Sequence, residues 1–190
     1  KRVDLNSIFI NPMMDMGTMM HSTPLEQPIE NPIDTDYFSN LAIFIMPSGE
    51  MGSWNISFEI ETKTGEFITG NMPITVESSW RLTSVRDKVY FITWFTPEDP
   101  VMGNNTLQYL VHTRENMMSF PSVDDVTLKI YPYMDMGGGQ GHSTDFTAPE
   151  AKGNGLYEGT INYSMSGMWT TSVQIIAGND TLPEATFEYS

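Results

Sequence analysis

The chain contains an internal repeat, and this repeat constrains its fold more than any other feature of the sequence. Residues 12–23 read PMMDMGTMMHST, and residues 132–144 read PYMDMGGGQGHST. Pro12 and the Met-Asp-Met-Gly of residues 14–17 recur at the same spacing as Pro132 and residues 134–137. The His-Ser-Thr of residues 21–23 recurs at residues 142–144, after one additional residue. Because so many matches in so short a stretch are improbable by chance, we predict that one folding unit occurs twice.

The similarity between the two halves continues downstream of the repeat. Residues 37–60 and 157–175 share a tyrosine, an apolar alternation that ends in methionine, a turn with glycine, a tryptophan and a second alternation. Each half therefore carries the same succession of elements. We predict two domains, residues 1–77 and 80–190, with the boundary between Ser78 and Ser79.

Alternation with a period of two predicts β-strands in both halves. Ile161, Tyr163 and Met165 alternate with polar residues before a turn, and Trp169 begins the next alternation. Trp54 begins the matching alternation in the first half. We interpret each pair of alternations as a β-hairpin with one buried face.

The remaining segments also favour strands, and no segment combines a helical stripe with capping residues. Both domains are expected to end on a similar strand, at residues 73–77 and 185–189. The predicted fold is all-β, with two tandem immunoglobulin-like antiparallel β-sandwich domains that lack the cysteine pair of antibodies, since the chain has no cysteine. Further strands are predicted at 80–86, 88–95, 107–113, 126–133 and 184–189.

The first domain is expected to lack its opening strands. Only residues 1–11 precede the repeat in the first half, whereas residues 80–131, with about three predicted strands, precede it in the second. A half-sandwich exposes an apolar face and unpaired edges. We expect a partner chain, the second domain or an extended first strand to fill the gap, or the chain to be the C-terminal part of a longer, processed protein.

The repeat also predicts a metal site in each domain. In an extended strand, residues two apart project from the same face, so Met14 and Met16 would present two thioethers together, as would Met134 and Met136. The following glycine lets the chain turn, so that His21 or His142 can return an imidazole toward the sulfurs. Two thioethers and one imidazole favour Cu(I). Asp15 and Asp135 would point away.

Core packing is the alternative interpretation of these methionines, because methionine fills apolar gaps and contacts aromatic rings through its sulfur. Met46 and Met165 lie on the alternating inward face and are expected in the core. Trp54 and Trp169 are expected to be core anchors. Met51 and Met168 are expected to stack on their indoles, and the alternative is that they contribute a metal ligand.

Two other features are interpreted as loops. His112 with Met117 and Met118 could supply an opposing metal ligand in the second domain, but a solvated loop is the simpler expectation. The glycines of residues 137–141 follow a strand, but no lysine or helix start accompanies them, so a long flexible loop is expected rather than a phosphate cradle.

Composition excludes several function classes. The chain has 24 acidic and 9 basic side chains, a net charge of −15, which argues against binding to nucleic acid. It has no apolar run of about 20 residues, so no membrane-spanning segment is predicted. The sequence contains no nucleophile elbow and no identifiable carboxylate pair, and we predict that the protein is not an enzyme and has no catalytic residues.

A family resemblance rests on the pattern Y-x-G-x-I-x-Y-x-M-x-G-M-W. It resembles the YtkA-like domain over residues 126–176 and, less closely, over residues 6–60, where the first half has an insertion between Met46 and Trp54. The resemblance implies a small extracytoplasmic β-sandwich related to FixH-type proteins, with no enzymatic activity and with some members beside copper-handling proteins. It is carried by Met134, Met136, His142, Tyr157, Met165, Gly167 and Trp169.

Two functions remain open. The protein is an extracytoplasmic sandwich, in the periplasm or at the cell surface where a lipid anchor could hold it, that binds copper or passes it to a copper-handling protein. Alternatively, it is a structural or adhesive surface module of a longer cell-envelope protein, with no metal role.

Overall fold

A computed structural model describes residues 4–30, 37–87 and 89–190 of the chain. These residues form β-strands, turns and bends and contain no helix, so the predicted all-β antiparallel fold class is confirmed. The chain divides into two compact units. Unit 1 comprises Lys1–Ser78 and Glu115–Phe120, and unit 2 comprises Ser79–Arg114 and Pro121–Ser190. In the described ranges, no helix has the length and hydropathy needed to cross a membrane.

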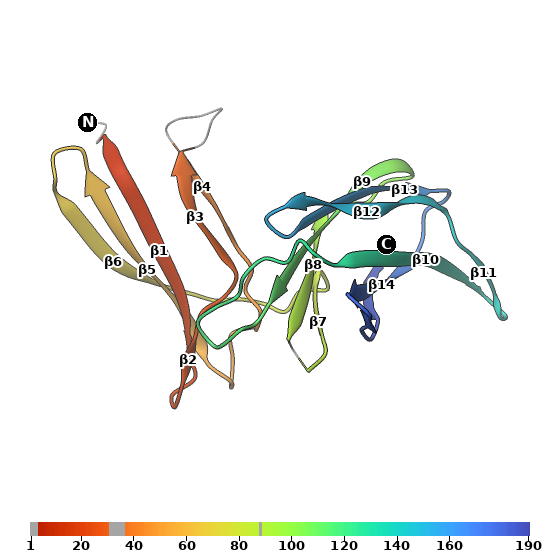
Figure 1. Ribbon diagram of the computed structural model, residues 1–190, viewed down its shortest axis with the longest axis horizontal. Helices are drawn as coiled ribbons and strands as arrows, with labels where there is room; N and C mark the ends of the chain where they lie inside the picture. The colour runs from red at the N-terminus through yellow and green to blue at the C-terminus, as the bar shows by residue number, and fades with distance from the viewer. Residues whose placement is uncertain (1–3, 31–36, 88) are drawn as a thin grey trace. The chain divides into compact units, whose positions relative to one another are not determined.

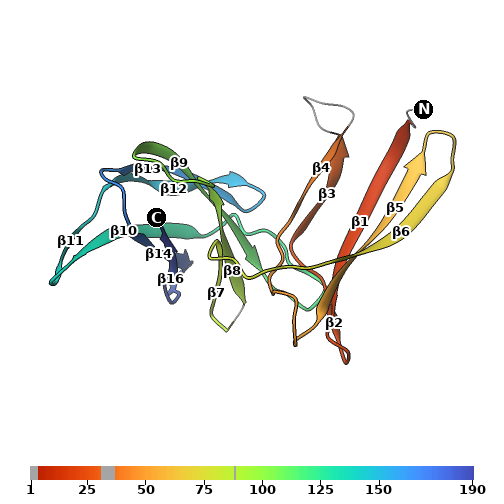
Figure 2. The same cartoon turned by 180° about the vertical axis from the view of Figure 1, so that it is seen from behind.

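Unit 2 contains two five-stranded antiparallel sheets in its described residues. The first has the order β11-β10-β14-β15, with β16 also paired to β14, and the second has the order β12-β13-β9-β8-β7 (Figures 1 and 2). The strands are β7 (Leu82–Val85), β8 (Tyr90–Thr96), β9 (Gly103–Thr113), β10 (Thr127–Gly137), β11 (Gln140–His142), β12 (Asp145–Gly153), β13 (Leu156–Tyr163), β14 (Trp169–Ala177), β15 (Asp180–Thr181) and β16 (Ala185–Tyr189).

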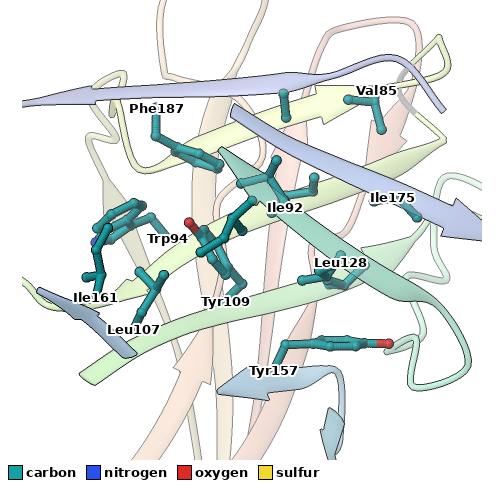
Figure 3. Packing of buried hydrophobic residues seen from close by; sticks show 14 of the residues in the cluster. Val85, Ile92, Trp94, Leu107, Tyr109, Leu128, Tyr157, Ile161, Ile175 and Phe187 are labelled. Carbon is teal, nitrogen blue, oxygen red and sulfur yellow. The ribbon is translucent and has the colours of Figure 1, made fainter. Parts of the chain in front are cut away.

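The core of unit 2 forms from the alternate residues of these strands. Leu128 and Ile130 of β10 are buried, whereas Lys129 and Tyr131 between them are exposed. Figure 3 shows side chains such as Trp94, Tyr109 and Phe187 converging in the interior of the unit. Burial of each large apolar side chain stabilises the fold by about 1.5–3 kcal/mol, so this cluster is the main source of the unit's stability.

The predicted hairpin between the two alternations of residues 157–175 is wrong. Strand β13 pairs with β12 and β9, and strand β14 pairs with β10, β15 and β16. The turn at residues 164–168 therefore carries the chain from one sheet to the other. Two alternations around a glycine turn fit a hairpin and a sheet-to-sheet connection equally well, because both bury every second residue.

Unit 1 has a four-stranded antiparallel sheet, in the order β2-β1-β5-β6, and a separate two-stranded sheet, β3-β4, in its described residues. Figures 1 and 2 show the β3-β4 hairpin as a layer of its own beside the sheet of β1, β5 and β6. As in unit 2, the chain passes from one sheet to the other between β4 and β5. The strands are β1 (Leu5–Asp15), β2 (Met20–His21), β3 (Leu25–Glu30), β4 (Phe38–Ala42), β5 (Ser53–Thr62) and β6 (Phe67–Ile74).

The last strand of unit 1 lies earlier than predicted. Strand β6 ends at Ile74, and the predicted strand at residues 73–77 is confirmed only in its first two residues. Val76 instead contacts a loop. The Val76 N–H donates to Ser48 Oγ at 3.0 Å, and the Ser48 N–H donates to the Val76 carbonyl at 2.8 Å. Strand β16, at the end of unit 2, coincides with the predicted range.

Candidate functional site

The repeated Met-Asp-Met-Gly stretch of unit 2 forms a tight hairpin. We call strands β10 and β11 with their turn the MDMG hairpin of unit 2, residues 134–142. Gly137 pairs with Gln140, so only Gly138 and Gly139 form the turn, and both have positive φ, 64° and 78°. Two positive φ angles are the requirement of a two-residue type I′ hairpin. The long flexible loop predicted here is therefore wrong.

The carboxylate inside this hairpin is engaged within the hairpin. The Gly137 N–H donates to Asp135 Oδ1 at 2.8 Å. Asp135 itself is exposed, in keeping with its predicted position away from the sulfurs. The hairpin contains no second carboxylate, and its side chains include two thioethers and an imidazole, so it offers soft ligands in preference to a cluster of carboxylates.

His142 has an oriented ring. Its Nδ1 lies 2.8 Å from the Ser143 carbonyl oxygen, and since a carbonyl can only accept, Nδ1 carries the hydrogen. The lone pair of the neutral imidazole is then on Nε2, which lies 3.3 Å from Met165 Sδ. The ring meets Trp169 edge-on, with centroids 5.4 Å apart and planes at 88°. The outer ring nitrogen and a thioether sulfur thus face each other.

Met165 is the site residue that the sequence analysis missed. It was predicted in the core, but its side chain is 38% exposed, because β13 ends at Tyr163 and Met165 lies in the connection to β14. The Trp169 Nε1–H donates to the Met165 carbonyl at 3.1 Å, which fixes the backbone beside His142. The spacing M-x-G-M-W carried this signal, because the tryptophan positions the methionine from four residues away.

Met134 and Met136 occupy different environments. Met134 lies directly opposite His142 in the register of β10 and β11 and is buried. Its Cε would lie 3.1 Å from a Cβ at Gly167, whose φ is +133°, so the glycine makes room for the thioether. Met136 lies at the exposed end of the hairpin, next to a shift in register. Of the two predicted sulfur-bearing residues, Met134 lies opposite the histidine in the strand register and Met136 lies in solvent.

Unit 1 repeats this arrangement in its own MDMG hairpin, β1 and β2 with their turn, residues 14–21. Met14 lies opposite His21, and the Gly17 N–H donates to Asp15 Oδ1 at 2.8 Å. Met14 Cε would lie 3.1 Å from a Cβ at Gly52. These contacts match those of Met134, His142, Gly137, Asp135 and Gly167 one by one.

The rings of the two units are also held alike. His21 Nδ1 lies 2.7 Å from the Ser22 carbonyl oxygen, and the ring meets Trp54 edge-on at 5.1 Å and 89°. The Trp54 Nε1–H donates to the Met46 carbonyl at 2.8 Å, as Trp169 does to Met165. The tryptophans are buried, as predicted for core anchors, and each also orients a histidine.

The two sites differ in exposure. His142 is half-buried, whereas His21 is 1% exposed and its Nε2 has no hydrogen-bond partner. Met14 is fully buried, and Met16, just past the end of β1, is half-buried. A buried nitrogen with an unused lone pair is costly unless something binds it. His21 Nε2 is therefore a buried nitrogen that could bind a soft metal ion.

The predicted solvated loop is wrong for His112, although Met118 lies exposed in the turn that follows β9. His112 lies in β9 and is buried, and burial lowers its pKa from 6.5 to about 4. Its place in β9, beyond Leu110, is at the opposite end of β13 from Tyr163, so it does not face His142. Met117 belongs to the segment Glu115–Phe120 of unit 1, where its carbonyl accepts the Ser22 N–H at 2.9 Å.

The donor chemistry of both hairpins suits a soft monovalent ion. The described part of the chain contains no group of three or more His, Asp or Glu side chains that could hold a metal, so a hard-cation or zinc-type site has no ligand set there. The hairpins instead combine one imidazole nitrogen with thioethers. Thioether and imidazole ligands select Cu(I).

One comparison with known proteins supports the resemblance of unit 2. Residues 84–174 match the model of the YtkA-like family. The matched range runs from β7 to β14 and includes Met134, His142, Met165 and Trp169. This range of unit 2 is therefore similar to the YtkA-like family. No curated protein and no solved structure matched the chain.

Proposed function

We propose that the protein is an extracytoplasmic binding protein that holds Cu(I) at the histidine and methionine side chains of each MDMG hairpin. A single observation carries this proposal. His142 Nε2 lies 3.3 Å from Met165 Sδ, and the Ser143 carbonyl oxygen holds the other ring nitrogen. A hydrogen bond from Nδ1 to a carbonyl is the usual way in which a metal-binding histidine is oriented, so the ring is prepared to bind through Nε2.

In unit 2, His142 Nε2 and Met165 Sδ would be two ligands, and Met134 or the exposed Met136 would supply a third. In unit 1, His21 would bind with Met14 and Met16. Copper bound there would supply a redox-active ion for transfer. The chain's own part is to bind and release the ion. Thioethers carry no proton, so protons compete only at the imidazole.

We further propose that unit 1 is a second, incomplete copy of the YtkA-like domain. The support is the set of contacts that recur around Asp15 and Asp135, His21 and His142, and Trp54 and Trp169. A duplicated fold with unrelated uses would not need to preserve the ring orientation of a histidine. The repetition therefore favours one chemistry at both hairpins.

Placement outside the cytoplasm follows from the same ligand chemistry. Thiolates are oxidised to disulfides in the periplasm and at cell surfaces, whereas thioethers do not form disulfides. A copper carrier built without cysteine suits such a compartment, and its partner would be another copper-handling protein. The protein performs no catalysis in this proposal.

The test is an anaerobic Cu(I) titration of the full chain against a chromophoric Cu(I) chelator. We expect about one equivalent per hairpin and loss of the unit 2 equivalent in Met165→Leu and in the double variant Met134→Leu with Met136→Leu. Met168→Leu, an exposed methionine three residues from Met165, is the matched control and should bind as the unmodified chain does. X-ray absorption should detect both Cu–S and Cu–N scattering. No binding stronger than that of the chelator would refute copper binding.

A structural or adhesive module remains the second candidate, and the burial of Met14 and Met134 favours it. Under this function, the buried methionines serve only to fill the ends of the sandwiches. Met134→Leu would then alter stability by less than about 1.5 kcal/mol, as volume-conserving changes do, and copper would not raise the melting temperature of the chain.

A further inference from the structure

We propose that the open face of the unit 1 sheet binds an extended strand of another polypeptide, with apolar side chains at alternate positions and basic flanks, in the place that β9 occupies in unit 2. The inference rests on the proposed duplication. It goes beyond copper, because it concerns a surface formed by β4, β5 and β6 and not the MDMG hairpins.

The register of the strands makes the two sheets comparable residue by residue. In unit 1, Met14 pairs with Trp54, and Ile8 pairs with Ile60. In unit 2, Leu128 pairs with Ile175, and these residues lie as far from Met134 and Trp169 as Ile8 and Ile60 lie from Met14 and Trp54. On the other side of the central strand, Trp54 pairs with Ile74, as Trp169 pairs with Tyr189. Strands β1, β5 and β6 thus correspond to β10, β14 and β16.

Corresponding positions differ sharply in burial. Met72 of β6 corresponds to Phe187 of β16, because each lies opposite the second residue after the tryptophan. Met72 is 50% exposed, and Phe187 is 0% exposed. The same contrast holds for Ile8, Ile10, Phe58 and Ile60, which are half-buried, against Leu128, Ile130, Val173 and Ile175, which are buried.

Strand β9 and its neighbours cover the corresponding face in unit 2. Leu107, Tyr109 and Val111 of β9 are fully buried in the core that includes Val173 and Phe187, and β9 pairs along the whole of β13. In unit 1, β4 corresponds to β13, since Thr23 Oγ1 donates to the Ile43 carbonyl as Thr144 Oγ1 donates to that of Asn162. Within the described part of unit 1, β3 is the one strand that pairs with β4.

An extended strand is the occupant that this geometry fits. It would continue the two-stranded sheet through backbone hydrogen bonds and place every second side chain on the apolar face. A second copy of the chain could not supply it from β9, which lies between β13 and β8 in its own sheet. The net charge of −15 also repels a second copy and favours a partner with basic residues.

The experiment uses a synthetic peptide with the sequence of residues 103–113, GNNTLQYLVHT, extended by two lysines at each end. The control peptide has serine at the positions of Leu107, Tyr109 and Val111. We expect the first peptide to bind the full chain and to slow amide hydrogen exchange at least tenfold at Ala42, whose N–H points away from β3, and the control to do neither. Met72→Lys should weaken binding at least tenfold, whereas Met102→Lys, at an exposed position of unit 2, should not.

Several outcomes would overturn the inference. These are equal binding of the two peptides, no protection of β4, or a concentration-dependent dimer in sedimentation that already protects these amides. None of them involves copper. A chain that binds Cu(I) but not the peptide would refute this inference alone, and a chain that binds the peptide but no Cu(I) would refute only the copper function.

Discussion

At the scale of single residues, His21 and His142 make the same kinds of contact but differ in solvent exposure. Each donates Nδ1–H to the next carbonyl and stands edge-on to a tryptophan, but only His142 is open to solvent at its side. Under the proposed function, an ion bound at His142 could exchange with a partner directly. An ion bound at the buried His21 could leave only when the surrounding residues move. The two hairpins are therefore expected to differ more in the rate of ion exchange than in affinity for the ion.

His112 gives a prediction on pH. Its folded pKa is about 4, below the ordinary 6.5, so the unfolded chain binds the proton first as pH falls. Stability should be greatest above pH 6.5 and should fall between pH 6.5 and 4 by up to about 1.4 kcal/mol per pH unit, about 3 kcal/mol in all. Guanidinium unfolding followed by tryptophan fluorescence measures this. In His112→Gln this part of the slope should vanish, and an unchanged slope would contradict the assignment.

At the scale of elements, the sequence identifies strands better than it identifies their partners. The alternations around Ile161 and Trp169 mark β13 and β14, but the expected hairpin between them is a crossing between sheets. Alternation reports which face is buried, whereas pairing depends on which apolar surface lies opposite. The same uncertainty hid Met165. The alternation predicted that Met165 lies in the core. Because β13 ends two residues earlier, Met165 lies outside the strand and contacts His142 instead.

The MDMG hairpins were more predictable, because their signal is local. The repeated residues already implied that His21 would return beside Met14 and His142 beside Met134, and the registers place them opposite each other. What the sequence did not show is the two-residue turn at Gly138 and Gly139. A run of glycines fits a flexible loop and a type I′ turn equally well, since both need freedom at positive φ.

The turn leads to a prediction at the level of the element. Gly138 has a φ of +64°, with open space around its Cα. Gly138→Asn should be tolerated, because asparagine adopts this conformation readily, whereas Gly138→Val should cost about 1–2 kcal/mol or more through backbone strain. Thermal unfolding of the two variants checks the difference. In Gly138→Val, amide exchange at Gly141 should also rise. Equal melting temperatures would show that the turn is not held in this conformation.

At the scale of the whole molecule, the two units differ in how much apolar surface they bury. Unit 2 buries the facing sides of two five-stranded sheets, whereas the described part of unit 1 has a four-stranded sheet with a two-stranded layer beside it. Buried apolar area is the main favourable contribution to folding. Unit 1 therefore has less to stabilise it, although its MDMG hairpin is built with the same contacts.

This difference predicts unequal protection of the two central strands. In native-state hydrogen exchange, the amides of Ile56–Ile60 in β5 should exchange at least tenfold faster than those of Thr171–Ile175 in β14. The physical reason is that local opening costs less where fewer apolar contacts are lost. The control is the bound state with the β9 peptide, in which β5 should slow and β14 should not change. Equal protection in the free chain would contradict the prediction.

The hydrogen bonds of the MDMG hairpin are short in sequence range, and this has a consequence for engineering. Gly137 to Asp135 and His142 to Ser143 close within two residues, and the tryptophan that meets the ring comes from the neighbouring strand. Because these contacts are local, the segment could be transferred to another protein as one unit. Moved with its tryptophan and its facing glycine onto another antiparallel sheet, it should retain its histidine orientation. The proposed copper site could then be tested in an unrelated protein by transplanting one strand, one turn and one tryptophan.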